Sequence, residues 1–180
     1  MPFLHLPIQS GSNKVLKLMN RKHDQEYYLS IIKKLKNVRK NIKISSDFIV
    51  GYPGETEKDF EDTIKLVKKI GFINSYSFIF SPRPGTPSSN KKLNNLLESK
   101  ERLKKLQYIL SGYKLKNNKM HFGKFSEVLV ENRLNNQKFF FGRTQIMTSV
   151  KFESDNCKPG ELASVKITSF NYNNLFGFHK

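Results

Sequence analysis

The hydrophobic positions of the first 80 residues follow two different periods. Recurrence every three or four residues predicts half-buried helices, whereas short unbroken apolar runs between turns predict buried strands. In chain order the pattern predicts a strand at 3–8, helices at 13–19 and 24–39, a strand at 43–50, a helix at 57–70 and a strand at 75–80. Strands alternating with helices at this spacing imply parallel pairing with right-handed crossovers. Three such strands make an incomplete sheet, which could be half of a barrel.

The segment from Ile44 to Glu57 is the centre of this arrangement. Its strand ends at a turn in which Gly51 and Gly54 permit backbone angles that other residues resist. Thr56 and Asp59 then form a shortened capping box for the next helix. The turn lies at the carboxyl end of the strand, where α/β folds bind their ligands. The same residues also suit a βα turn without a ligand, because fold alone does not determine function.

The spacing of the hydrophobic positions changes in the last third of the chain. After a loop with three prolines at 81–90, an apolar stripe that begins at Leu96 and Leu97 predicts a helix over 93–116. Five short strands separated by turns are then predicted at 126–131, 138–144, 149–152, 162–169 and 175–178. Strands of this number and length indicate a small antiparallel barrel. The fold class is therefore α/β followed by all-β, with domains at 1–116 and 117–180.

Charge adds an expectation about partners. The net charge of +17 favours an anionic partner, and nucleic acid is the obvious one. Of the 32 basic residues, 26 are lysines and only six are arginines, which is typical of a compositionally biased genome. The lysines of the helix at 24–39 are expected to form its solvated face, with Val38 on the apolar face. The charge thus supports RNA binding without locating it.

Cysteine content and hydropathy set further bounds. Cys157 is the only cysteine, so the 180 residues can form no internal disulfide and cannot alone hold an all-cysteine iron–sulfur cluster. A single cysteine that can form no internal disulfide fits a reducing cytoplasm. No apolar run approaches the roughly 18 residues that span a membrane, and residues 1–12 do not resemble a signal peptide. The chain begins inside an expected strand, which suggests a missing upstream part.

Four ordered motifs resemble a known enzyme family. They are HLPIQSGS at 5–12, MNRKH at 19–23, SSDFIVGYPGETE at 45–57 and SYSFIFSPRPGTP at 75–87. Together they resemble the tRNA-modifying methylthiotransferases of the radical S-adenosylmethionine (radical SAM) enzymes. The last 60 residues resemble that family's RNA-binding TRAM barrel at Gly123-Lys124, Val128–Glu131, Gly142–Thr144, Gly160 and Val165–Thr168. The chain would therefore be a C-terminal piece of such an enzyme, containing half of a partial (β/α) barrel and a TRAM domain.

The resemblance implies a set of cofactor-binding residues. S-adenosylmethionine would lie across the carboxyl ends of the strands, where Gln9 and Ser10 can bond a ribose or an amino-acid moiety. Arg21 can pair with the methionine carboxylate, Asp47 can accept from ribose hydroxyls, and the backbone at Ile49–Gly51 can flank the adenine. Each residue also has a structural alternative, since the first two can close a turn and Arg21 can be a surface cation. A buried Asp47 would need a partner in any case.

Two further residues near these motifs are expected to be structural. His5 lies beside apolar residues and is expected to be a satisfied core histidine. Glu55 is expected mainly to favour the helix N-terminus.

The predicted barrel has its own candidate site. Aromatic residues are interleaved with cations in this part of the chain, a composition that suits an unpaired RNA strand. Half or more of the aromatic side chains must instead fill the barrel. The expected RNA contacts are Lys138, Arg143 and Lys166, among the aromatic residues Phe139, Phe140, Phe141, Phe170, Tyr172, Phe176 and Phe178, with His179.

The sequence departs from the family where the reactive centre is concerned. The family holds two [4Fe–4S] clusters on cysteines that this sequence lacks. Two hypotheses follow. In one, the chain works in methylthiolation at C2 of the isopentenyl-adenosine next to the anticodon, together with a separate N-terminal chain that carries the cysteines. In the other, it is a catalytically inactive remnant that retains tRNA binding.

Overall fold

The computed structural model describes residues 1–89, 91–134 and 138–179. Clustering of the chain gives two compact units, one formed by residues 4–110 and the other by residues 1–3 and 111–180. The elements of the first part are β1 (Phe3–His5), α1 (Asn13–Leu18), α2 (Gln25–Val38), β2 (Lys43–Ser45), β3 (Asp47–Val50), α3 (Glu57–Ile70) and β4 (Tyr76–Ile79). They are followed by α4 (Leu96–Lys119), β5 (Phe125–Arg133), β6 (Phe139–Thr144), β7 (Ser149–Glu153), β8 (Leu162–Phe170) and β9 (Asn174–Phe178).

The strands of the first part are parallel, as their alternation with helices predicts. β3 pairs with β4 from Asp47 opposite Tyr76 to Val50 opposite Ile79. On the other side of β3, the backbone of Gln9 donates to Asp47 and accepts from Ile49, both at 2.9 Å. β1 pairs with β2. β3 is therefore flanked by Gln9, which follows β1, on one side and by β4 on the other.

The predicted strand at 43–50 is interrupted at Ser46. The Ser46 hydroxyl accepts from the amide of Ile8 at 2.9 Å, and the Ser46 amide donates to the hydroxyl of Ser75 at 3.0 Å. Side-chain hydroxyls thus replace ladder bonds at this position. The break divides the segment into β2 and β3.

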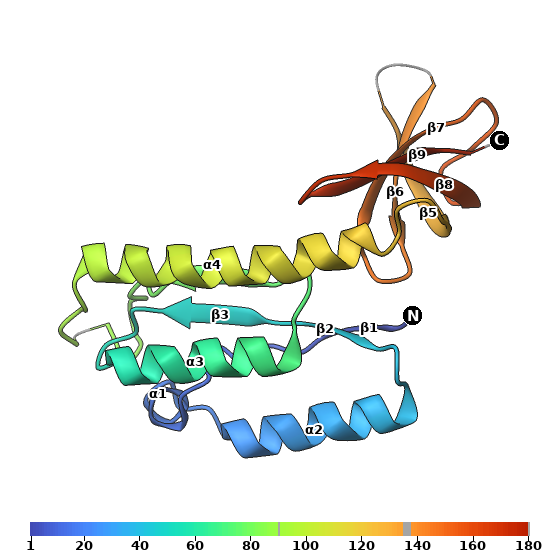
Figure 1. Ribbon diagram of the computed structural model, residues 1–180. Helices are drawn as coiled ribbons and strands as arrows, with labels where there is room; N and C mark the ends of the chain where they lie inside the picture. The colour runs from blue at the N-terminus through green and yellow to red at the C-terminus, as the bar shows by residue number, and fades with distance from the viewer. Residues whose placement is uncertain (90, 135–137, 180) are drawn as a thin grey trace. The chain divides into compact units, whose positions relative to one another are not determined.

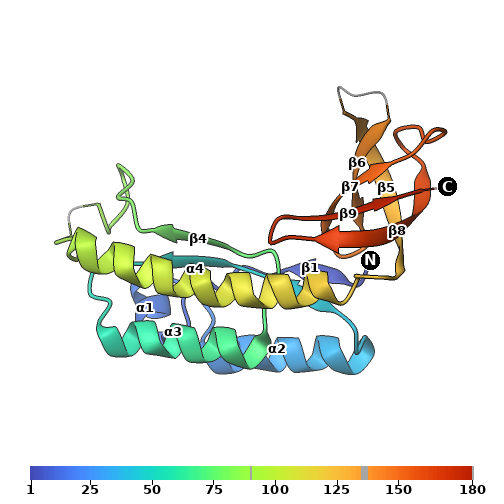
Figure 2. The same ribbon diagram turned by 45° about the horizontal axis from the view of Figure 1, so that its top comes forward.

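Helices α2 and α3 lie along one side of these strands (Figure 1 and Figure 2). The strand residues on that face, Phe48 and Val50, are fully buried, and the ring of Phe48 meets Phe72 edge-on at 5.3 Å. Tyr28 of α2 is buried and donates its hydroxyl proton to the carbonyl of Leu6 at 2.7 Å. Val38 was expected on the apolar face but is 90% exposed, because the helix ends there and Arg39 is already extended.

The local signals around α3 are confirmed. Thr56 and Asp59 form a complete capping box in which each side chain accepts from the other residue's amide. Gly71 ends the helix in the left-handed conformation, with φ of 71°.

Helix α4 starts and ends three residues later than predicted. Leu106 and Leu110 are buried, but Leu96 and Leu97 are exposed, contrary to the predicted stripe. Arg102 occupies a buried position of this helix instead. Within the described residues, no helix has the length and apolarity to cross a membrane.

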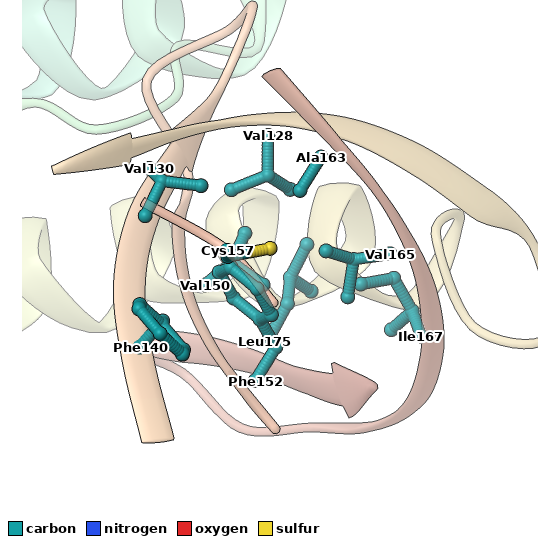
Figure 3. Close-up of a cluster of buried hydrophobic side chains, with 10 residues drawn as sticks. All are labelled: Val128, Val130, Phe140, Val150, Phe152, Cys157, Ala163, Val165, Ile167 and Leu175. Atoms are coloured by element: carbon teal, nitrogen blue, oxygen red, sulfur yellow. The ribbon is translucent and has the colours of Figure 1, made fainter. Parts of the chain in front are cut away.

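The second unit contains a closed five-stranded barrel, with neighbouring strands in the order β5-β6-β7-β9-β8. Its interior is a single apolar cluster that includes Phe140, Phe152 and Cys157 (Figure 3). Four of the five strand pairs are antiparallel, but β7 and β9 are parallel. The predicted barrel is therefore present, and its fully antiparallel pairing is not, because the last strand closes the barrel by entering between β7 and β8.

Candidate ligand site on the parallel sheet

The face of the sheet opposite the helices carries both polar and aromatic side chains. Alternation along β3 puts Phe48 and Val50 toward the helices and leaves Asp47 and Ile49 on the other face, where both are partly exposed. The register places Asp47 beside Tyr76 and Ile49 beside Phe78. Tyr76 and Phe78 are 62% and 55% exposed. A carboxylate next to flat apolar rings suits a ligand that has both hydroxyl groups and a planar ring.

His5 lies next to Asp47 on this face. Its Nε2 atom is 3.3 Å from the Asp47 carboxylate, and its Nδ1 atom is 2.9 Å from the hydroxyl of Ser45. The expectation that His5 is a core histidine is wrong, because its side chain is 40% exposed. Asp47 is partly exposed rather than buried as expected, and its ionic partner is His5 of β1. Only the alignment of the strands that carry His5 and Asp47 could have indicated this pair.

Gln9 and Ser10 form the turn that follows β1. Gln9 has a φ of 77°, which is uncommon for a residue with a side chain, and its backbone bridges to β3. The Ser10 hydroxyl is fully buried, lies 3.3 Å from the hydroxyl of Thr63 and accepts from the amide of Ser12 at 3.2 Å. Gln9 lies next to Asp47 and Ile49, whereas the Ser10 hydroxyl is occupied by bonds that tie the turn to α3.

Gly51 begins the turn after β3 and is held by Glu55. The amide of Gly51 donates to the Glu55 carboxylate at 2.7 Å, and its φ is +70°. A Cβ atom at this position would overlap the side chain of Ser99. Both the backbone angle and the close approach of α4 therefore require glycine here.

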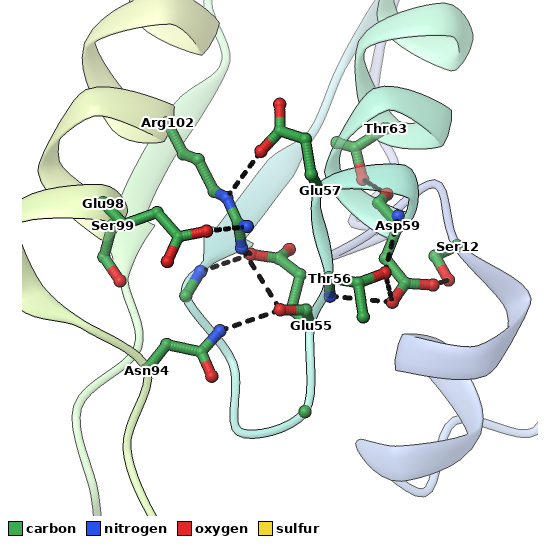
Figure 4. A network of polar contacts seen from close by, with 12 residues as sticks. Ser12, Glu55, Thr56, Glu57, Asp59, Thr63, Asn94, Glu98, Ser99 and Arg102 are labelled. Carbon is green, nitrogen blue, oxygen red and sulfur yellow. Dashed lines mark hydrogen bonds and ion pairs between the residues drawn. The ribbon is translucent and has the colours of Figure 1, made fainter.

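Glu55 is buried in an ion-pair network with α4 (Figure 4). Arg102, 4% exposed, donates to the Glu55 carboxylate at 3.0 Å and also pairs with Glu57 and Glu98. Asn94 donates to the Glu55 carbonyl at 3.0 Å. Burial raises the pKa of Glu55, and the bonds from Gly51 and Arg102 oppose that rise. The role of Glu55 is thus wider than the predicted effect on the helix N-terminus, since it joins the turn to α4.

Asp59 is the second charged centre of this region (Figure 4). Its carboxylate accepts from the hydroxyl of Ser12 at 2.7 Å, from the amide of Thr56 at 2.9 Å and from the ammonium group of Lys14 at 2.9 Å. Partial burial works against ionisation, but these bonds prevail and hold the pKa of Asp59 far below its usual value. Asp59 thereby fixes α1 to the start of α3.

Arg21 lines a separate cavity of about 530 Å³ beside α1 and the start of α2. Its lining residues are Asn13, Lys17, Arg21, Lys22, His23, Asp24 and Tyr27. Neither Gln9 nor Asp47 is among the described residues that line this cavity. The structure therefore groups Gln9, Asp47, Ile49 and Gly51 around β3 and places Arg21 in a different, basic pocket.

The three predicted RNA contacts occupy different surroundings on the barrel. Lys138 is exposed at the start of β6, whereas Arg143 is half-buried and pairs with Glu131 at 3.5 Å. The ammonium group of Lys166 lies 4.9 Å from the ring centre of Phe125, a 66% exposed residue that sequence reasoning missed. Phe140 is fully buried, in line with the expectation that some of the aromatic residues fill the barrel.

An iron–sulfur cluster does not fit the residues present. In the described part of the chain, no group of three or more His, Cys, Asp or Glu side chains could hold a metal ion. Cys157 is buried in the barrel core. We therefore derive no reaction step through a cluster on this chain.

The sequence is similar to those of known proteins over nearly its whole length. The profile of the Radical SAM superfamily matches residues 1–67. A tRNA-2-methylthio-N(6)-dimethylallyladenosine synthase of Pelagibacter ubique is 51% identical over 177 residues, which cover 98% of this chain and 40% of the relative. Proteins of the same name from Rickettsia conorii and Buchnera aphidicola are each 46% identical over 180 residues. The chain spans about 40% of the length of these curated relatives.

Proposed function

We propose that this chain, which spans about 40% of the length of the tRNA methylthiotransferases it resembles, belongs to their radical SAM family and functions in tRNA modification. The proposed reaction is methylthiolation at C2 of the isopentenyl-adenosine next to the anticodon. The observation that carries the proposal is the 51% identity, which extends over 98% of the chain and so includes both the sheet and the barrel.

The exposed face of the sheet supports S-adenosylmethionine as the cofactor. Asp47 offers carboxylate oxygens to ribose hydroxyls, while Ile49 and the aromatic residues of β4 offer apolar surface to a planar base. S-adenosylmethionine, when bound, would supply the methyl group and the radical chemistry of the family. The residues of this chain would bind and orient it. Gln9 and Gly51 complete the proposed set around β3, whereas the Ser10 hydroxyl is bonded within its turn and Arg21 lines the separate cavity.

The cluster cysteines must come from elsewhere if the reaction is to occur. Cys157 is the only cysteine of the 180 residues and is buried, so we propose a second partner besides tRNA, a polypeptide that carries the cluster cysteines. The second candidate function is that of an inactive protein that only binds tRNA. The barrel would then be the functional part.

Co-expression separates the two functions. This chain would be produced together with the cysteine-bearing part of a relative in a host that lacks its own methylthiotransferase, and tRNA nucleosides would be measured by mass spectrometry. The methylthio group should appear only when both polypeptides are present. If both are soluble and the modification never appears, the enzyme proposal fails and tRNA binding is left to be measured.

A further inference from the structure

Two aromatic side chains stand side by side on the outside of strand β9. Leu175 points into the barrel and is fully buried, so Phe176 and Phe178 lie on the outer face. Phe176 is partly exposed and Phe178 is 37% exposed. The barrel interior already contains Phe140 and Phe152. The rings of Phe176 and Phe178 are therefore not part of the barrel core.

Lysines flank these rings on both neighbouring strands. The register pairs Phe176 with Lys151 of β7 and Phe178 with Lys166 of β8. The Cβ atoms of residues directly opposite one another on adjacent strands are about 5 Å apart, so each ring has a lysine as its cross-strand neighbour. Lys151 lies on β7 and Lys166 lies on β8. They flank β9 only because β9 inserts between these two strands and closes the barrel.

The pattern continues outward by one more strand on each side. Lys151 is in register with Phe141 of β6, and Lys166 is in register with Phe125 of β5 and lies over its ring. Two rows thus run around the barrel, each with a lysine between two phenylalanines. We call the four residues on β9 and its two neighbouring strands, Phe176, Phe178, Lys151 and Lys166, the β9 face, which Phe141 and Phe125 border. Glu153, which is in register with both Phe178 and Phe139, is the carboxylate at its border.

Rings alternating with cations match the chemistry of unpaired nucleic acid. Each base presents a flat face that stacks on an aromatic side chain, and each phosphate needs a cation. A duplex hides its base faces inside the helix, so it could use only the lysines of such a surface. Arg143, by contrast, forms an ion pair with Glu131. Its cross-strand neighbour on β5 is Leu129, and Glu127, two residues earlier, lies on the same outer side of that strand. Arg143 is therefore a weaker candidate for a phosphate contact than the lysines of the β9 face.

We propose that the β9 face binds unpaired RNA by stacking bases on Phe176 and Phe178 while Lys151 and Lys166 contact the backbone. This inference rests on the proposed function, because it takes RNA as the partner, and it adds the place and the mode of binding. It also assigns Lys151 and Phe125, which the sequence did not single out, and gives Arg143 no direct part.

The test compares two RNA probes on the full 180-residue chain. Fluorescence anisotropy would measure the binding of a labelled 12-nucleotide unpaired RNA and of a 12-base-pair duplex, with the wild type and with a Phe176→Leu/Phe178→Leu variant. Leucine retains apolar bulk but removes the ring on which a base stacks, so the variant should bind the unpaired probe at least about tenfold more weakly. Its affinity for the duplex should stay within about twofold.

A second variant tests the cations independently of the rings. Lys151→Gln/Lys166→Gln should weaken binding of both probes. On the unpaired probe it should also lower the slope of log K against log salt by about 0.7 for each phosphate that a lysine no longer neutralises. The matched controls are Tyr108→Leu on α4 and Lys158→Gln in the loop before β8, which should change neither the affinity nor the slope. Circular dichroism would show that each variant is folded.

The outcomes are distinguishable. If the wild type binds neither probe, the proposed RNA binding itself fails. If the wild type binds but both double variants bind as it does, RNA contacts another surface and the β9 face is refuted. Equal losses on the unpaired and duplex probes in the phenylalanine variant would also refute stacking. Should that variant be unfolded, the lysine variant alone decides, because an unchanged salt slope would contradict the proposal. If the face instead docks a protein, none of these variants will change RNA binding.

Discussion

At the scale of single residues, Asp59 shows how a short sequence signal becomes a source of stability. Four donors converge on its carboxylate, from Ser12, Lys14 and both the amide and the hydroxyl of Thr56. The folded-state pKa is far below the ordinary value of 3.8. The ionised form is therefore bound more tightly by the fold than the protonated form. This contribution to stability is fully present above about pH 4 and is lost as the pH falls below it.

Replacing Asp59 with asparagine tests this account. We expect Asp59→Asn to lower the free energy of unfolding at pH 7 by about 1–3 kcal/mol, since a helix cap and charged hydrogen bonds are weakened. The deficit relative to the wild type should shrink as the pH is lowered from 5 toward 3. Urea denaturation at several pH values measures it. Asp62→Asn, at an exposed pair with Lys65, is the control and should cost less than about 0.5 kcal/mol. A deficit independent of pH would contradict the role of the charge.

Asp47 carries the prediction about the proposed cofactor. Its carboxylate is only 30% exposed and its one described ionic partner is His5, so oxygen lone pairs remain for ligand hydroxyls. In the co-expression system, Asp47→Asn should reduce methylthio product about 10- to 100-fold, as expected when hydrogen bonds to a charged group worth about 1.5–3 kcal/mol are weakened.

The Asp47→Asn experiment needs a stability measurement beside the tRNA analysis. The thermal midpoint should change little, because the side chain is not in the core. Glu101→Gln, an exposed position of α4, is the matched control and should leave the product unchanged. Wild-type product from the Asp47 variant would remove this residue from the proposed site.

Residue-level features were predictable from sequence only where the interaction is local. The capping box at Thr56 and Asp59 and the left-handed Gly71 could be read directly, because they depend on spacing within one turn. The pairs His5–Asp47 and Glu55–Arg102 join residues 42 and 47 positions apart. Nothing in either local segment identifies the partner, so both required the register of the fold.

At the scale of elements, the contact between α4 and the turn after β3 depends on one buried ion pair. Arg102 and Glu55 are each at most 5% exposed, and Glu55 in turn holds the amide of Gly51. Removing either of the two side chains leaves the charge of the other one buried without its partner. We therefore expect Arg102→Met to cost about 3–5 kcal/mol in the free energy of unfolding. The double variant with Glu55→Gln should cost less than the sum of the two single changes.

The pH dependence of the Arg102 variant gives a further check. Burial raises the folded-state pKa of Glu55 above its ordinary value of 4.5, and removing Arg102 should raise it more. A protonated Glu55 needs no cation, so the cost of Arg102→Met should decrease as the pH falls toward about 4.5. A double-mutant cycle in urea at pH 7 and pH 5 measures both effects. Additive costs at both pH values would show that the two residues act separately.

Element types were predictable from periodicity, and the pairing partners of the strands were not. All three parallel strands and all five barrel strands occur where the pattern predicts them. The break at Ser46 escaped prediction because hydroxyl groups substitute for ladder bonds there. The parallel pairing of β7 with β9 escaped because alternation within a strand does not specify its neighbours. The β9 face depends on that pairing and so could not be seen in the sequence.

At the scale of the whole molecule, the two units differ in how their sheets end. The barrel is closed, so each of its strands has a neighbour on both sides. In the unit of residues 4–110, β4 has β3 as its one described neighbour, and the face that carries Tyr76 and Phe78 is open. Unpaired strand edges and exposed aromatic residues lower local stability and promote association. The sheet of this unit is therefore expected to open more readily than the barrel.

Hydrogen exchange followed by mass spectrometry should reveal this difference in the isolated chain. Peptides from β5–β9 should keep their deuterium protection longer than peptides from β1–β4, because opening a closed barrel requires breaking two ladders for each strand. Adding the cysteine-bearing polypeptide, which would supply strands upstream of β1, should slow exchange in β1 and leave the barrel unchanged. Equal protection of both units without the partner would mean that the open sheet is as stable as the barrel, and the need for a completing polypeptide would then rest on the cluster cysteines alone.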